Sequence, residues 1–153
     1  IQDLYILTTK IPRHKKWGDR SSSSAAKSLS MHEYTEVGSC FKELRKNFDK
    51  IYATHLSSDA ANLYELNLTE KVALVFGNEH GGLSEETLAL CDGNFIIPQV
   101  GIIKSLNISV ACAVSIYEAY RQKAGAGHYA RPQLSSDDFS MLKNKWGFYE
   151  GEE

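Results

Sequence analysis

"IPQVGIIKSLNISVACAVSIYEAYRQ", residues 97–122, begins as a loop and ends as a helix. The loop carries one proline and one glycine, and the part that follows is apolar or small around almost the whole helical wheel. This pattern predicts a helix over 106–122 that is buried between the sheet and another partner, such as a second subunit. Ser105 suits the N-cap of that helix. Asn107 has no equally good structural role, so its amide is a candidate functional group.

Short apolar segments alternate with amphipathic ones along the rest of the chain. The continuous apolar run Val72–Phe76 is followed by a glycine, which favours a parallel strand buried on both faces. Ser84 and the two glutamates after it are typical of a helix N-terminus. The alternation predicts an α/β fold with a parallel sheet. The expected strands are 1–7, 51–56, 72–76 and 94–98, and the expected helices are 39–48, 57–66, a stretch from Ser84 and a short turn from Ala25.

Three loops follow expected strand ends, at residues 54–58, 77–82 and 98–107. Ligands of open parallel sheets bind beyond the carboxyl ends of the strands, so these loops are expected to share one site. The second loop reads GNEHGG but lacks the G-K-[ST] ending of a phosphate-binding loop. Its unusual residue is Glu79, a carboxylate just past a buried strand. Taken alone, Glu79 is better interpreted as a surface residue.

The composition of the 153 residues, 42% hydrophobic and 24% charged, fits one soluble globular domain with a substantial core. Its three cysteines form no C-x-x-C pair, which favours reduced thiols in a cytoplasmic protein. No apolar run is long enough for a membrane span, and no signal peptide is recognisable. The histidines lack metal-site spacing, and no serine stands in G-x-S-x-G. Metal-dependent, membrane and α/β-hydrolase functions are therefore not expected.

The net charge of −2 is unevenly distributed along the chain. Residues 10–20, KIPRHKKWGDR, hold five basic side chains and one acid, whereas the chain ends in EGEE. A basic loop with an aromatic residue is typical of an RNA-binding segment. From the loop alone, a solvated surface segment is the better interpretation.

The two ends of the chain stand apart from the central pattern. The sequence starts with IQDLYIL, without Met and already inside an expected strand, which indicates a fragment or the ordered part of a longer chain. Residues 1–123 are expected to form one domain. Residues 124–153 open with two glycines and are expected to form a separate tail that ends in a short amphipathic stretch around Trp146.

The loops carry a family resemblance. LVFGNEHGGLS and IIPQVGIIKSLNISVACAVSIYEAYRQ resemble motifs 2 and 3 of the SpoU (TrmH) branch of the SPOUT RNA methyltransferases. IYATHLS and YRQKAGAGHYARP are most similar to members that methylate the 2'-hydroxyl of a tRNA guanosine. The resemblance runs from residue 1 to about 131. It implies a deep C-terminal trefoil knot, an exception to the rule that chains do not thread loops. It also implies S-adenosylmethionine bound by the knot loops, a tRNA or rRNA substrate, and a homodimer joined largely through the 106–122 helix.

The resemblance assigns roles residue by residue. The positions that match cofactor contacts of the family are Thr54, Gly77, Ile97, Gly101 and Leu106. Glu79, Ser105 and Asn107 match active-site positions. Asn107 would hold the knot loops or the substrate ribose, and Glu79 would tie down a neighbouring loop or the motif 1 arginine. The basic residues expected to contact RNA are Arg13, Lys15, Lys16, Arg20 and Arg121. The reaction requires no metal.

One family motif is not in this sequence. Motif 1, N-x-x-x-x-x-R, whose arginine is proposed to activate the 2'-hydroxyl, is expected just before IQDLYIL. Either the sequence is a trimmed version of the protein, which we favour, or the arginine has been lost. Three functions stay open: a 2'-O-methyltransferase of the tRNA D-loop guanosine, an rRNA 2'-O-methyltransferase, or an RNA- or cofactor-binding domain without catalysis. A motif 1 segment upstream in the full-length gene would support the enzyme.

Overall fold

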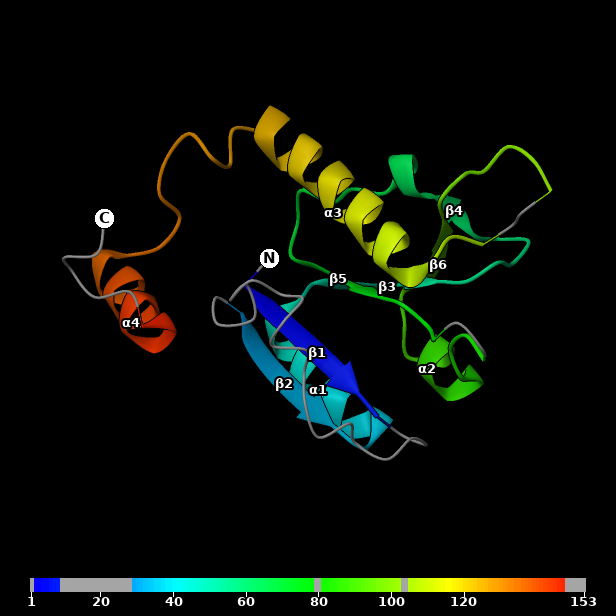
Figure 1. The fold of residues 1–153 in the computed structure, drawn as a ribbon, viewed down its shortest axis with the longest axis horizontal. Coiled ribbons are helices and arrows are strands. Elements are labelled where there is room, and N and C mark those ends of the chain that lie inside the picture. Colours follow the sequence, from blue (N-terminus) through cyan, green and yellow to red (C-terminus); the bar gives the residue numbers. More distant parts are fainter. Residues whose placement is uncertain (1, 9–28, 79–80, 103–104, 148–153) are drawn as a thin grey trace. The chain divides into compact units, whose positions relative to one another are not determined.

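The computed structural model describes residues 2–8, 29–78, 81–102 and 105–147 (Figure 1). The chain divides into two compact units. The first combines Ile1–Glu36 with Arg131–Glu153, and the second is Val37–Ala130. Within the described ranges, no helix has the length and apolar character needed to span a membrane.

The second unit is built on a four-stranded parallel sheet. Its strands are β3 (Lys50–Thr54), β4 (Ala61–Asn62), β5 (Val72–Val75) and β6 (Gly93–Ile96), in the order β4-β6-β3-β5. Every pairing in this sheet is parallel, so that prediction is confirmed. The expectation that β5 is buried on both faces is wrong, because β5 is an edge strand and its four residues are only half-buried.

Helix α3 (Ile108–Gly125) covers one face of this sheet (Figure 1). Val114 and Ala119 of α3 pack against a buried apolar cluster. The cluster consists of Leu63, Leu66, Leu68 and Phe95. Within the single chain only Ser115 and Glu118 of α3 are buried, so the sheet covers one side of the helix, and burial of its other side against a second subunit stays a prediction. Its other face leaves apolar side chains exposed, Tyr117 to 75%.

The opposite face of the sheet is also buried at its centre. Side chains alternate along a strand, so Ile51 and Ala53 point away from the side that Tyr52 faces, and both are fully buried. Helix α1 (Val37–Asn47) supplies further core residues of this unit, among them Phe41 and Leu44, as its helical period predicts. The unit therefore has buried core residues on both faces of its sheet.

Helix α2 (Glu85–Ala89) confirms the predicted start signal. The Ser84 side chain is its N-cap and accepts a hydrogen bond from the Thr87 backbone N–H at 3.3 Å. Glu85 and Glu86 lie in its first turn, where a negative charge interacts favourably with the helix dipole. This short helix follows directly on the 77–82 loop.

The helix expected over 57–66 is wrong. Residues 61 and 62 form β4, and Leu63–Glu65 make a single 3-10 turn, η2. The Asn62 side chain accepts from the Tyr64 N–H at 3.0 Å, and the Glu65 carboxylate accepts from the Asn62 N–H at 3.3 Å. This capping box completes the turn, and Leu66 then continues with extended backbone.

The first unit contains a two-stranded parallel sheet of β1 (Asp3–Leu7) and β2 (Ser30–Tyr34). β1 was expected, but β2 was not, and the helical turn from Ala25 lies largely outside the described residues. The Tyr5 and His32 rings stack at 4.7 Å across the pair. The expected amphipathic stretch in the tail is α4 (Ser136–Trp146), and Lys145 Nζ donates to Ser30 Oγ at 2.8 Å.

Candidate functional site

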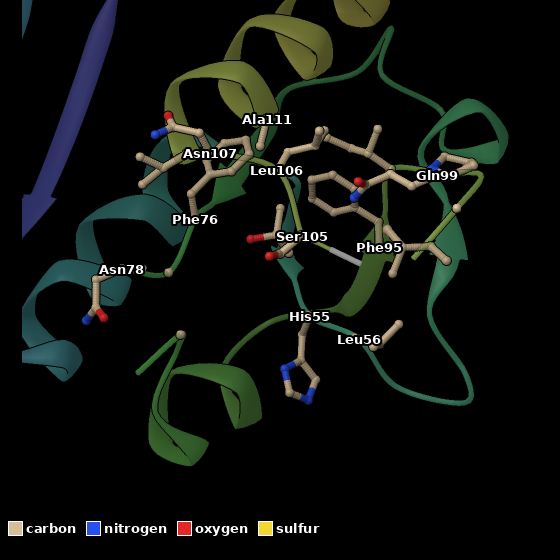
Figure 2. Close-up of a pocket in the computed structure, with 18 residues that line it drawn as sticks. His55, Leu56, Phe76, Asn78, Phe95, Gln99, Ser105, Leu106, Asn107 and Ala111 are labelled. Carbon is tan, nitrogen blue, oxygen red and sulfur yellow. The ribbon is translucent and has the colours of Figure 1, made fainter. Parts of the chain in front are cut away.

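A pocket of about 850 Å³ lies at the carboxyl ends of β3, β5 and β6 (Figure 2). Its described lining comes from three segments: 54–56 after β3, the turn after β5, and the stretch from Phe95 to Ala111. These are the three loops that were expected to share a site. The volume lies within the roughly 300–1,000 Å³ of small-molecule sites.

The pocket combines apolar walls with a few polar groups. Phe76 and Phe95 meet edge to face, with ring centroids 6.3 Å apart and an interplanar angle of 87°. Ile97 and Leu106 extend this apolar surface. At its edge the Thr54 hydroxyl donates to the Val75 carbonyl at 3.3 Å, which joins the ends of β3 and β5. A flat aromatic group with a polar substituent fits such a lining.

The structure brings most of the candidate residues together. All five candidate cofactor contacts line the pocket: Thr54, Gly77, Ile97, Gly101 and Leu106. Ser105 and Asn107 line it as well. Glu79 lies outside the described residues, and so do Arg13, Lys15, Lys16 and Arg20.

The roles expected of Ser105 and Asn107 at the helix start are reversed. Asn107 is the N-cap of α3, and its Oδ1 accepts from the Ser109 N–H at 2.8 Å. The helix begins at Ile108, so Ser105 lies too early to cap it and is an exposed residue of the pocket lining. Ser105 is thus the residue without a capping role. Asn107 uses its oxygen on the helix and still borders the pocket.

Several lining residues were not singled out from the sequence. His55, Phe76, Asn78 and Phe95 all line the pocket. Their position in the sequence could have indicated them, because each lies within three residues of the carboxyl end of a strand. His55 is the one ionisable side chain among the lining residues that the structure describes. The described lining therefore contains no Asp, Glu, Lys or Arg.

Arg121 is not part of this pocket lining. Its guanidinium donates twice to the buried Glu118 carboxylate, at 2.8 Å from both Nε and Nη2. This bidentate contact, together with the hydrogen bond from Gln122, outweighs the effect of burial and lowers the pKa of Glu118. Gln122 also bonds the Leu66 carbonyl and the Leu68 N–H, so it fastens α3 to the 66–68 segment. The charge of Arg121 is largely compensated within the helix.

Comparison with known proteins identifies the family. The model of the SpoU rRNA Methylase family matches residues 1–117. The chain belongs to this family. It is 37% identical over 128 residues to a tRNA (guanosine(18)-2'-O)-methyltransferase of Thermus thermophilus, a match that covers 84% of this chain. The chain spans 66% of that relative, and 50% and 55% of those from Aquifex aeolicus and Escherichia coli.

Solved structures of SpoU proteins resemble the chain over most of its length. The A. aeolicus TrmH/SpoU tRNA modifying enzyme superposes with a TM-score of 0.86 at 29% identity, covering 99% of this chain and 77% of that one. The SpoU methyltransferase AviRb of Streptomyces viridochromogenes, solved in complex with AdoMet, gives 0.70 at 26% identity, covering 80% and 50%. The parallel α/β architecture is therefore that of SpoU methyltransferases.

Proposed function

We propose that this chain is the S-adenosylmethionine-binding and methyl-transfer part of an RNA 2'-O-ribose methyltransferase. The observation that carries the proposal is the single pocket that gathers all five candidate cofactor residues with Ser105 and Asn107. The substrate we propose is tRNA guanosine 18, after the activity for which the relatives are named. The deep trefoil knot is part of this proposal, as is a homodimer through α3.

The pocket suits this cofactor in shape and charge. An adenine ring fits between apolar side chains such as Phe76, Ile97 and Leu106. A sulfonium carries a positive charge, and the described lining holds neither lysine nor arginine. Gly101 leaves the backbone accessible where a loop borders the pocket, since no atom lies within 4 Å of a Cβ built there, and its φ of 130° favours glycine.

The residues of the chain would act mainly by alignment. S-adenosylmethionine supplies a methyl group that its sulfonium already activates for displacement. Holding the attacking oxygen in line with that methyl contributes up to about 7–11 kcal/mol in ideal cases. Ser105 and Asn107, at the mouth of α3, are the described polar groups that we assign to hold the ribose. Removal of the 2'-hydroxyl proton is assigned to the arginine of the family's motif 1, which this sequence does not contain.

Calorimetry with S-adenosylhomocysteine tests the cofactor part of the proposal. The chain should bind S-adenosylhomocysteine. Leu106→Arg should abolish binding, because it places a long charged side chain in an apolar wall of the pocket. Leu90→Arg is the matched control, because Leu90 is exposed and outside the described lining. Equal affinity in a folded Leu106→Arg variant would refute the site.

Two other functions are separated by methylation assays on tRNA and rRNA transcripts. An rRNA substrate is supported by the description of the family model and predicts methyl transfer to rRNA only. A binding domain without catalysis predicts affinity for S-adenosylhomocysteine but no transfer to either RNA, including in the protein encoded by the full-length gene.

A further inference from the structure

We infer that Asn78 is a positioning residue that closes the turn after β5 and so holds one wall of the pocket. Asn78 lines the pocket together with Gly77 and Gly82, the two glycines on either side of the turn. The inference rests on the proposed function only for the identity of the ligand, because the closure of the turn is a property of the chain itself.

Among the described residues, Asn78 makes two hydrogen bonds across the turn. Its side-chain Oδ1 accepts from the Gly81 N–H at 2.7 Å. Its backbone carbonyl accepts from the Gly82 N–H at 3.0 Å, and the two residues form an isolated antiparallel bridge. One residue therefore satisfies two successive amides on the far side of the turn. An asparagine is suited to this, because its short side chain readily bonds backbone groups a few residues away.

The closed turn restricts movement of the pocket wall that Gly77 and Gly82 form. A Cβ atom at Gly77 would lie 2.5 Å from the Gly82 carbonyl carbon, so the two sides of the turn are in contact. Gly82 adopts a φ of 63°, which favours glycine. If the side-chain bond from Asn78 were lost, Gly81 would lose its acceptor, and the wall formed by Gly82 would keep the backbone bond to Asn78 but be held less firmly against Gly77.

The same contacts distinguish this turn from a phosphate-binding loop. Such loops direct free backbone N–H groups at the ligand. Here the Gly81 and Gly82 amides donate to Asn78. The turn therefore contributes shape to the pocket, and those two amides are not available to an anion while the turn is closed.

Binding of S-adenosylhomocysteine to three single variants tests the inference. Asn78→Ala removes the Oδ1 acceptor and should weaken binding by roughly three- to tenfold, the effect of one ordinary hydrogen bond. Asn78→Asp keeps an oxygen at the same place and should bind within about twofold of the parent chain. Asn67→Ala is the matched control, because Asn67 Oδ1 also accepts a backbone N–H, from Thr69 at 3.1 Å, outside the described lining.

Amide hydrogen exchange at Gly81 separates this inference from the proposed function. Exchange there should accelerate in Asn78→Ala and stay slow in Asn78→Asp, whether or not the chain binds the cofactor. Unchanged exchange in Asn78→Ala would overturn the inference. It would also be overturned if the parent chain binds the ligand and Asn78→Ala binds equally well, or if Asn78→Asp binds as weakly as Asn78→Ala. Failure of the parent chain to bind would instead count against the proposed function.

Discussion

Gly77 and Gly82 are in backbone contact across the turn after β5. A Cβ atom built on Gly77 would come within 2.5 Å of the Gly82 carbonyl carbon and 2.8 Å of its oxygen. Side-chain carbons do not approach backbone atoms so closely, so this wall of the pocket depends on the missing side chain at position 77. The glycine is required here by the close approach of two chain segments.

Gly77→Ala should therefore open the turn and distort the pocket. We expect at least about tenfold weaker binding of S-adenosylhomocysteine, because the new methyl group forces backbone atoms apart. Gly38→Ala is the control, since no atom lies within 4 Å of a Cβ there and alanine favours its helix, α1. Calorimetry on both variants measures the difference. Equal affinity in the two would show that the turn does not shape the site.

Substitutions of Asn107 separate its structural role, as the N-cap of α3, from its proposed role in holding the ribose. Asn107→Ala removes the N-cap of α3 and should lower the free energy of unfolding by about 1 kcal/mol. Asn107→Asp keeps an equally good cap oxygen but loses the amide donor, so its stability should remain near that of the parent chain. Thermal unfolding measures the first effect, and methyl transfer by the full-length protein measures the second. If Asn107→Asp retains full transfer, Asn107 is a cap and nothing more.

The N-cap residues show how well the sequence predicts where helices begin. Ser84 was placed correctly because it is a good cap residue followed directly by two glutamates, which favour the first turn of a helix. Before α3, Ser105 and Asn107 are both good cap residues two positions apart, and propensity alone does not choose between them. The choice depends on where α3 packs against the sheet after the loop from β6, which is a tertiary property. The loop positions were predictable because strand ends in a parallel sheet meet at one edge.

The incorrect predictions of secondary structure and burial have similar causes. The segment 57–66 has cap residues and leucines at helical spacing, yet pairing of β4 with β6 takes up its first part and η2 ends after one turn. SMHEY has little apolar alternation, so β2 was not recognisable without its partner β1. The exposure of β5 followed from its edge position, which no local pattern encodes.

Asp92 should make the stability of the chain depend on acid pH. Its carboxylate accepts from Arg45 Nη1 at 2.6 Å and from the Ile51 N–H at 2.7 Å. Burial raises the pKa of Asp92, but these hydrogen bonds and the nearby positive charges outweigh it, so the pKa is lowered overall. The resulting stabilisation is fully present above the unfolded-state pKa of about 3.9 and is lost as the pH falls through the lower folded value.

Asp92→Asn should lower the free energy of unfolding near neutral pH by about 1.5–3 kcal/mol, the usual range for hydrogen bonds to a charged group. The difference from the parent chain should shrink below about pH 4, where the parent carboxylate also becomes protonated. Urea unfolding across this pH range measures it. Glu36→Gln removes one charge from an exposed position and is the control. A difference that does not depend on pH would contradict the ionic explanation.

The exposed apolar side of α3 predicts a homodimer. Tyr117 is 75% exposed and Tyr120 54% exposed, and their rings lie 6.4 Å apart in an edge-on arrangement. A helix with such a surface gains by burying it against a second copy of itself. Sedimentation at micromolar concentration should give a dimer, and Tyr117→Glu should shift it towards the monomer. Tyr64→Glu alters a similarly exposed tyrosine on η2 and should leave the dimer intact. A folded parent chain that sediments as a monomer would contradict the proposal.

The basic segment 10–20 should bind tRNA through phosphates. Each lysine or arginine that neutralises a phosphate steepens the salt dependence of binding by a slope of about 0.7–0.9. Replacing Lys15 and Lys16 together by alanine should therefore weaken tRNA binding and reduce that slope by about 1.4–1.8. Binding of S-adenosylhomocysteine should not change, because neither residue belongs to the three pocket loops. In the full-length enzyme the KM for tRNA should rise more than kcat falls, since these contacts hold the RNA before and during transfer alike.

The matched control for the lysine pair is the double replacement of Lys42 and Lys46 by alanine on α1, which removes the same charge. Filter binding of tRNA at several salt concentrations gives affinity and slope for both variants. We expect the slope to fall only for the Lys15 and Lys16 variant, because phosphate contact is local whereas net charge is shared. If neither affinity nor slope changes in that variant, the segment is a solvated loop. If both double variants lose affinity equally, overall charge explains the binding and the assignment of Lys15 and Lys16 to the RNA contact is wrong.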